Sequence, residues 1–135
     1  MPAGYSGTPL AKKLTLKEGM RVWFDDMPVS IRAEIDEYGL TLAEEEAPSK
    51  GLNAAHIFTA ERAVLEERLK MLRHLIDPTG QVWVSWPKKA SGMPTEIDQA
   101  MVQEAGLAIG FVDTKKCAVD EVWSGLKFVI RKELR

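Results

Sequence analysis

The strongest structural signal in this sequence is the run Gln-Val-Trp-Val-Ser-Trp-Pro at residues 81–87. β-Branched and aromatic side chains dominate it, and a proline followed by Lys88 and Lys89 ends it. A long helical pattern precedes the run, and Asp77-Pro78-Thr79-Gly80 between them predicts a tight turn. An apolar run placed between two helical segments is typical of an inner strand in a sheet that is covered on both faces.

Length and composition restrict the class of protein. A chain of 135 residues predicts one domain, 1–135, with residues 1–18 as an N-terminal arm and short helix. A net charge of -2 and a pI near 5.7 argue against a nucleic-acid-binding face. No apolar run reaches the ~20 residues of a membrane helix, and Met1–Tyr5 lacks a secretory pattern, so we expect a cytoplasmic protein without a membrane partner. Cys117 is the only cysteine, which excludes an internal disulfide.

Hydrophobic periodicity and breaker residues divide the chain into alternating elements. After an unstructured start over residues 1–6, the pattern predicts helices at about 9–14, 31–38, 60–76 and 95–110, and strands at 21–25, 40–43, 54–58, 81–86, 111–119 and 126–130. Within the longest helix, one buried stripe is formed by Leu65, Leu69, Leu72 and Ile76. In the last helix, the predicted buried side is Ile97, Met101, Ala105 and Ala108, with Gly106 and Gly110 at a fraying end.

This order of elements predicts the fold class. Strands that alternate with helices favour a mostly parallel sheet with right-handed crossovers and helices on both faces. The short connection 120–125 makes the last two strands antiparallel neighbours. The expected fold is therefore an α/β three-layer Rossmann-like sandwich, closed by a C-terminal antiparallel hairpin.

Three segments carry a resemblance to a known family: residues 4–14 (GYSGTPLAKKL), 83–88 (WVSWPK) and 119–127 (VDEVWSGLK). They resemble a bacterial family of uncharacterised proteins, domain-of-unknown-function family 3052, over nearly the whole chain. The element order also resembles a reduced class I S-adenosylmethionine-dependent methyltransferase fold, without about one strand and its helix. The family resemblance supports the fold and implies no established activity.

The methyltransferase resemblance implies a glycine-rich turn after the first strand. The corresponding turn here is Asp25-Asp26-Met27-Pro28, whose carboxylates and proline make a poor cradle for a phosphate. Glu44 matches by position the acid that holds a ribose in such folds. We therefore predict no cofactor.

Candidate ligand-binding residues lie where the predicted strands end, since ligands of open α/β sheets bind beyond the carboxyl ends of the strands. They are Asp25, Asp26, Thr59, Trp86, Lys88, Lys89, Trp123 and Ser124. Residues 4–8 could lie over the same edge. Lys88 and Lys89 could hold an anion or be solvated loop lysines. Asp25 and Asp26 could pair with these lysines or transfer protons, but adjacent strand residues face opposite ways, so we expect only one of them at the site.

The remaining reactive residue types favour structural roles. His56 lies in an apolar strand and is expected to be a core histidine bonded to the backbone, whereas His74 is expected on the solvent side of its helix. Two histidines so placed, without paired cysteines, predict no metal site. Cys117 beside two lysines could be an activated thiolate, but a buried inert thiol is favoured. Trp86 or Trp123 could stack on a planar ligand.

Three functional hypotheses follow from the sequence. The preferred one is a small non-enzymatic protein that binds a ligand or a protein partner. The alternative is a small enzyme that acts on an anionic metabolite, using Lys88 for charge recognition and Asp25 or Asp26 for proton transfer. A third is an interaction protein that pairs through an exposed edge strand. The sequence identifies neither a catalytic residue nor an oligomeric state.

Overall fold

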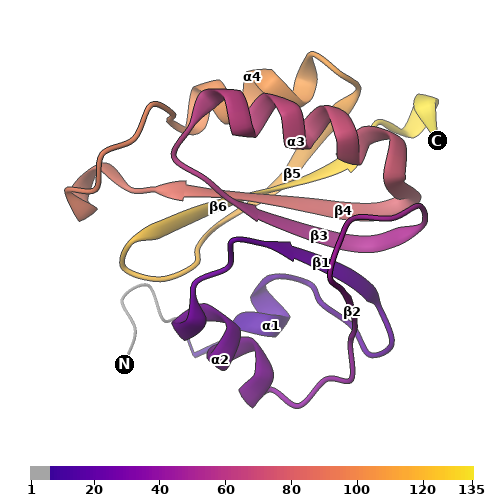
Figure 1. The fold of residues 1–135 in the computed structure, drawn as a ribbon, viewed down its shortest axis with the longest axis horizontal. Helices are drawn as coiled ribbons and strands as arrows, with labels where there is room; N and C mark the ends of the chain where they lie inside the picture. Colours follow the sequence, from indigo (N-terminus) through magenta and orange to yellow (C-terminus); the bar gives the residue numbers. More distant parts are fainter. Residues whose placement is uncertain (1–6) are drawn as a thin grey trace.

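The computed structural model describes residues 7–135, in which a six-stranded sheet lies between two layers of helices (Figure 1). The segment that we expected to be unstructured, residues 1–6, lies outside the described part. The strand order is β2-β1-β3-β4-β6-β5. The strands are β1 (Arg21–Asp25), β2 (Ala43–Glu45), β3 (Leu52–Phe58), β4 (Ile76–Pro87), β5 (Phe111–Ala118) and β6 (Trp123–Ile130).

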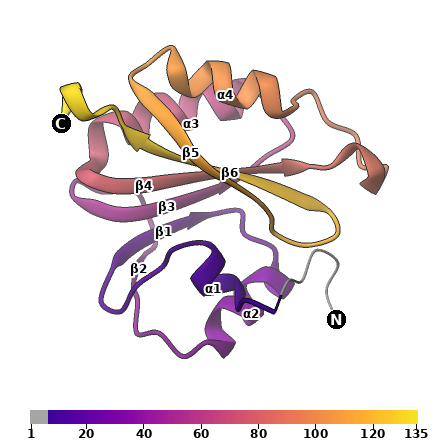
Figure 2. The same ribbon diagram turned by 180° about the vertical axis from the view of Figure 1, so that it is seen from behind.

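The predicted fold class is confirmed. Strands β1, β2, β3 and β4 are parallel to one another, and β6 is antiparallel to both β4 and β5. The α-helices are α1 (Leu10–Lys13), α2 (Val29–Glu37), α3 (Arg62–Leu75) and α4 (Gln99–Leu107), and two short 3₁₀ helices are η1 (Lys89–Ser91) and η2 (Lys132–Leu134). Figures 1 and 2 show α1 and α2 on one face of the sheet and α3 and α4 on the other. Within residues 7–135, no helix combines the length and the apolar character of a membrane span.

Strand β4 supplies side chains to both apolar layers. Trp83 packs in the cluster on the α1 and α2 side, whereas Trp86 packs in the cluster on the α3 and α4 side. Residues three apart in a strand point to opposite faces, as the sequence predicts. Strand β4 lies between β3 and β6 in the sheet, and hydrophobic layers on both faces of the sheet bury its side chains.

The predicted tight turn at residues 77–80 is wrong. Strand β4 already begins at Ile76, which pairs with Leu52, and residues 77–80 form an irregular stretch of the strand before Gln81 pairs with Ala54. The Asp77 carboxylate accepts hydrogen bonds from the backbone N–H and the hydroxyl of Thr79. The turn-forming residues of this stretch therefore make a local turn-like contact without ending the strand.

Element ends differ from the predictions by a few residues. Strand β2 begins at Ala43, where the predicted strand ended, because Leu40 and Leu42 pack their side chains under the sheet before the backbone joins it. Helix α3 begins at Arg62, so Thr59 is not its N-cap. Strand β6 begins at Trp123, three residues earlier than predicted, so this tryptophan belongs to the sheet and pairs with Pro87 of β4.

The buried side of helix α4 is partly as predicted, since Met101 and Ala105 pack against the core and Ile97 is buried just before the helix begins. Asp98 caps it by accepting a 3.0 Å hydrogen bond from the Met101 N–H, so Ile97 precedes the helix and does not set its buried side. Val102 and Gly106 are buried, whereas Ala108 is exposed. Gly106 therefore does not mark a fraying end: it is the point where the helix approaches the sheet closely.

Candidate functional site

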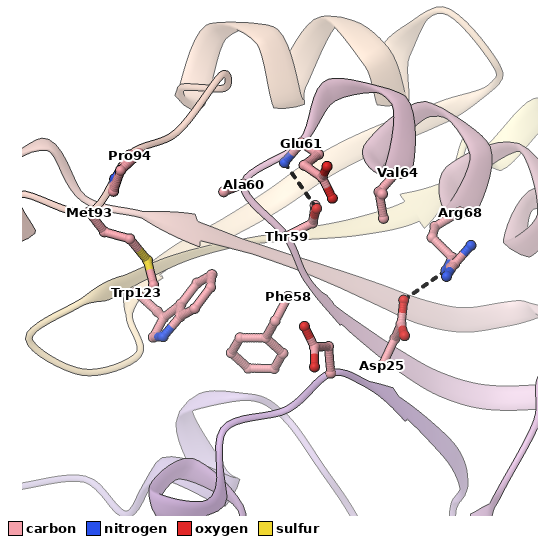
Figure 3. A pocket seen from close by; sticks show the side chains of 11 residues that line it. Asp25, Phe58, Thr59, Ala60, Glu61, Val64, Arg68, Met93, Pro94 and Trp123 are labelled. Atoms are coloured by element: carbon pink, nitrogen blue, oxygen red, sulfur yellow. Dashed lines mark hydrogen bonds and ion pairs between the residues drawn. The ribbon is translucent and has the colours of Figure 1, made fainter.

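A hollow opens beside the carboxyl ends of β1 and β3. From β1 the chain crosses through α2 to β2, and from β3 it crosses through α3 to β4 on the other side. The two neighbouring strands therefore form a topological switch point, the usual ligand position in open α/β sheets. The hollow has a volume of about 720 Å³ and is lined by Asp25, Asp26, Phe58, Thr59, Ala60, Glu61, Val64, Arg68, Met93, Pro94 and Trp123 (Figure 3). We refer to it as the switch-point pocket.

Both carboxylates at the end of β1 line the switch-point pocket, contrary to the expectation that only one would. Asp25 is the last residue of β1, and Asp26 follows it with a φ of 57°. This left-handed conformation breaks the alternation of an extended chain, so consecutive side chains can reach the same space. Asp26 thus adopts the backbone conformation that glycine takes most readily, while keeping a carboxylate.

Arg68 of α3 is the charged residue of the switch-point pocket that sequence reasoning missed. Its Nε donates a 2.8 Å hydrogen bond to the Asp25 carboxylate, and its Nη1 donates one of 2.7 Å to Glu67. The hydrogen bond to Asp25 raises the pKa of the Arg68 guanidinium. A signal was present, since Arg68 lies one helical turn after Val64 and directly before the buried Leu69.

Aromatic and apolar side chains form the other wall. The rings of Phe58 and Trp123 meet edge to face, with centroids 5.3 Å apart and an interplanar angle of 82°. Met93 and Pro94, from the loop between η1 and α4, lie beside Trp123 in Figure 3. This wall therefore combines segments that are far apart in the sequence.

Thr59 and Glu61 connect the end of β3 to the start of α3. The Thr59 hydroxyl accepts a 3.1 Å hydrogen bond from the Glu61 N–H, and the Thr59 N–H donates to the Ser85 carbonyl. These bonds hold the backbone at the base of the switch-point pocket, so Thr59 acts here through its position rather than as a helix cap.

The other four predicted site residues are not among the described residues that line this pocket. Trp86 is buried, and Ser124 pairs with it across the β4–β6 ladder. The Lys88 ammonium donates a 2.6 Å hydrogen bond to the Asp120 carbonyl, and Lys89 is exposed at the start of η1. An anion held by Lys88 and Lys89 stays a prediction.

His56 and Ser85 form a buried pair beneath the switch-point pocket. His56 Nε2 and Ser85 Oγ are 2.7 Å apart, so the partner of His56 is a hydroxyl and not the expected backbone group. The imidazole stacks on Phe58, and burial lowers the pKa of His56 to about 3. His56 is therefore neutral at physiological pH.

Cys117 is half-buried in β5 rather than fully buried. Burial raises the pKa of its thiol, although Lys13 and Lys115 favour the thiolate. The neutral thiol therefore predominates near pH 7, in agreement with an inert role.

The fold places the chain in the Rossmann-like class typified by S-adenosylmethionine-dependent methyltransferases. It is similar to a SAM-dependent methyltransferase from Aquifex aeolicus, with 15% identity, a TM-score of 0.62, and coverage of 90% of this chain and 89% of that one. It is also similar to a putative type 11 methyltransferase from Sulfolobus solfataricus, with 12% identity, a TM-score of 0.57 and 86% of each chain covered. Fibrillarin of Aeropyrum pernix, solved with natively bound S-adenosyl-L-methionine, shows 10% identity and a TM-score of 0.54 over 93% of this chain and 70% of that chain. At these identities the likeness shows the fold alone.

Within that class, residues 11–132 match the family described as "Protein of unknown function (DUF3052)", so the chain belongs to this family. No curated protein matches the sequence. The resemblance inferred from residues 4–14, 83–88 and 119–127 is confirmed.

Proposed function

We propose that this protein binds a small organic molecule in the switch-point pocket without transforming it. The observation that carries the proposal is the pocket itself: about 720 Å³, at the topological switch point, with an aromatic wall opposite carboxylates. Its volume is within the range of about 300–1,000 Å³ that small-molecule sites occupy.

The engagement of its reactive groups supports binding over catalysis. Asp25 is already engaged in an ion pair with the Arg68 guanidinium, at 2.8 Å. His56 and Ser85 have the spacing of a base and a nucleophile, yet the two residues are only 2% and 0% exposed. A ligand in the switch-point pocket would reach neither of them without a rearrangement of Phe58.

The fold similarity suggests an alternative, a methyltransferase that uses S-adenosylmethionine. The residues of this chain fit that cofactor poorly. The turn after β1 places two carboxylates in the pocket lining, and it contains Pro28, which lacks an N–H group, where a glycine-rich turn would offer backbone N–H groups. Glu44, the positional match for a ribose-binding acid, accepts hydrogen bonds from both terminal nitrogens of Arg32. We therefore derive no methyl-transfer step.

Filling the pocket provides the test. Native mass spectrometry of the purified protein and thermal-shift screening of metabolites, including S-adenosylmethionine, would identify ligands.

We predict that Val64→Phe, which adds a ring to the pocket wall, weakens binding of any such ligand at least about tenfold, because the ligand would have to displace a packed side chain. Ala63→Phe is the matched control. Ala63 is exposed at the preceding position of α3, so this variant should leave the affinity unchanged.

Two results would overturn the proposal. The first is a ligand whose affinity is equal in the wild type, Val64→Phe and Ala63→Phe. The second is turnover of a bound metabolite that disappears in Val64→Phe, which would favour the enzyme hypothesis.

A further inference from the structure

We propose that the switch-point pocket selects organic cations, in which an ammonium or alkylated ammonium group is attached to an apolar or aromatic body. This inference rests on the proposed binding function and adds the chemical class of the ligand. It departs from the anionic ligand that the sequence suggested. The charges that line the pocket are mostly negative, whereas Lys88 and Lys89, which were expected to receive an anion, do not line it.

The charge balance of the lining is the first observation. Asp25, Asp26 and Glu61 contribute carboxylates, and Arg68 contributes the one guanidinium among the lining residues. That guanidinium is already shared between Asp25, at 2.8 Å, and Glu67, at 2.7 Å. The positive charge of Arg68 is therefore already compensated by two carboxylates, although these two bonds use only two of its five N–H donors.

Asp26 and Glu61 are the carboxylates that remain. Within residues 7–135, neither forms an ion pair, and each is exposed at the pocket opening. They come from different elements, the turn after β1 and the N-cap of α3, so two separate segments place negative charge around one hollow. Carboxylates that line one hollow repel each other, and a bound cation relieves that repulsion.

The aromatic wall is the second, independent observation. Trp123 is half-buried and lines the pocket with its ring edge to face with Phe58. A cation near the face of a tryptophan ring is attracted by the ring quadrupole, and tryptophan is the strongest residue for this interaction. Met93, 45% exposed and unbranched, can adapt to apolar bodies of different shape.

Nucleotides and other phosphorylated ligands are disfavoured by the same lining. A phosphate at this sheet edge would meet Asp25 and Asp26 where other open α/β proteins offer backbone N–H groups. The cost of desolvating these carboxylates beside a phosphate is not offset by Arg68, because its single positive charge is already paired with Asp25 and Glu67.

A pair of probes that are matched in size and opposite in charge tests the inference. Isothermal titration of the full chain with 3-phenylpropylammonium and with 3-phenylpropionate, and with neutral 3-phenylpropanol as the third probe, compares charge at nearly constant apolar area. We expect the cation to bind at least about tenfold more tightly than the carboxylate, and raised salt to weaken the cation alone. Equal or tighter binding of 3-phenylpropionate would overturn the inference.

Variants assign the effect to the pocket. Asp26→Asn combined with Glu61→Gln should weaken binding of the cation about 5–10-fold, as expected for partly exposed charge pairs. The affinity for the neutral probe should be unchanged. Trp123→Leu should weaken the cation about fivefold or more. Glu104→Gln, an exposed acid of α4 outside this pocket, is the matched control and should change nothing.

The design separates this inference from the proposed function. If the neutral probe or the carboxylate binds at least as tightly as the cation, and Val64→Phe abolishes that binding, the pocket is a binding site but the cation assignment is wrong. If no probe binds and native mass spectrometry finds no retained molecule, the proposed function fails together with this inference. A cation affinity that is unchanged in the double variant would locate the cation elsewhere and would also overturn the inference.

Discussion

At the scale of single residues, His56 shows how burial decides the role of a reactive group. Its imidazole is hydrogen-bonded to the Ser85 hydroxyl, stacked on Phe58 and almost completely removed from solvent. Desolvation destabilises the imidazolium, which is why the pKa of His56 falls to about 3. The pair consequently behaves as a neutral polar link between β3 and β4.

This lowered pKa predicts a pH-dependent stability. An unfolded histidine titrates near pH 6.5, whereas folded His56 stays neutral down to about 3, so the unfolded state binds the extra proton between these values. The stability is therefore complete above pH ~6.5 and is lost as the pH falls. Between pH 7 and 5 we expect the free energy of unfolding to decrease by about 2 kcal/mol.

Denaturant unfolding at both pH values measures this loss. His56→Gln should remove most of the difference between pH 7 and 5, because glutamine does not titrate. His74→Gln, on the exposed side of α3, is the control and should keep it. An unchanged pH dependence in His56→Gln would contradict the assignment to His56.

Residue identity predicted part of the candidate site. Four residues of the pocket lining were predicted, because the sequence shows where strands begin and end: Asp25, Asp26, Thr59 and Trp123. The participation of Arg68 could not be read with the same ease, since a helical arginine beside an apolar stripe is usually solvated. The shared orientation of Asp25 and Asp26 depends on one left-handed residue, which an Asp-Asp-Met-Pro sequence permits but does not require.

At the scale of elements, α4 and β6 are positioned by a contact without a side chain. A Cβ atom at Gly106 would lie 2.3 Å from Cε1 of Phe128, well below any real contact distance. Glycine inside a helix costs roughly 1 kcal/mol relative to alanine, so its presence here is explained by the close approach of the two elements. Periodicity identified Met101 and Ala105 on the buried side but missed Gly106, because it counts apolar side chains and cannot register their absence.

Gly106→Ala is therefore expected to destabilise the protein despite the better helix propensity of alanine. Overpacking against Phe128 should outweigh the propensity gain and lower the free energy of unfolding by about 1–3 kcal/mol. In a Phe128→Leu background, where the ring is removed, Gly106→Ala should be neutral or stabilising. Denaturant unfolding of the four proteins in this double-mutant cycle tests the contact, and an equal cost in both backgrounds would contradict it.

At the scale of the whole molecule, the topology was predictable because it follows from order alone. Strands alternating with helices, followed by a short hairpin, are compatible with few sheets once right-handed crossovers are required. The switch point between β1 and β3, and hence the position of the pocket, follows from that topology. The lining charge does not, because it depends on which carboxylates the loops turn inward.

The three layers are joined by different means, and β4 joins both helical layers to the sheet. On the α1 side, the Leu14 carbonyl accepts a 2.9 Å hydrogen bond from the Trp83 indole and one of 2.8 Å from the Gln81 amide. On the α3 side, the Trp86 indole packs among the apolar side chains of that cluster. A polar tie thus accompanies hydrophobic contact in the layer formed by the shortest α-helix.

Trp83→Phe and Trp86→Phe separate these contributions, since both remove the same atoms from opposite faces of one strand. Each should lose a packing contribution of about 1–2 kcal/mol, and Trp83→Phe should lose about 1 kcal/mol more with its hydrogen bond to Leu14. Hydrogen exchange supplies the local readout: the Leu14 amide, which closes α1 by bonding to the Leu10 carbonyl, should exchange faster in Trp83→Phe than in Trp86→Phe. Equal stabilities and equal exchange in the two variants would mean that α1 is held by apolar contact alone, and that the indole bond contributes nothing to the attachment of this layer.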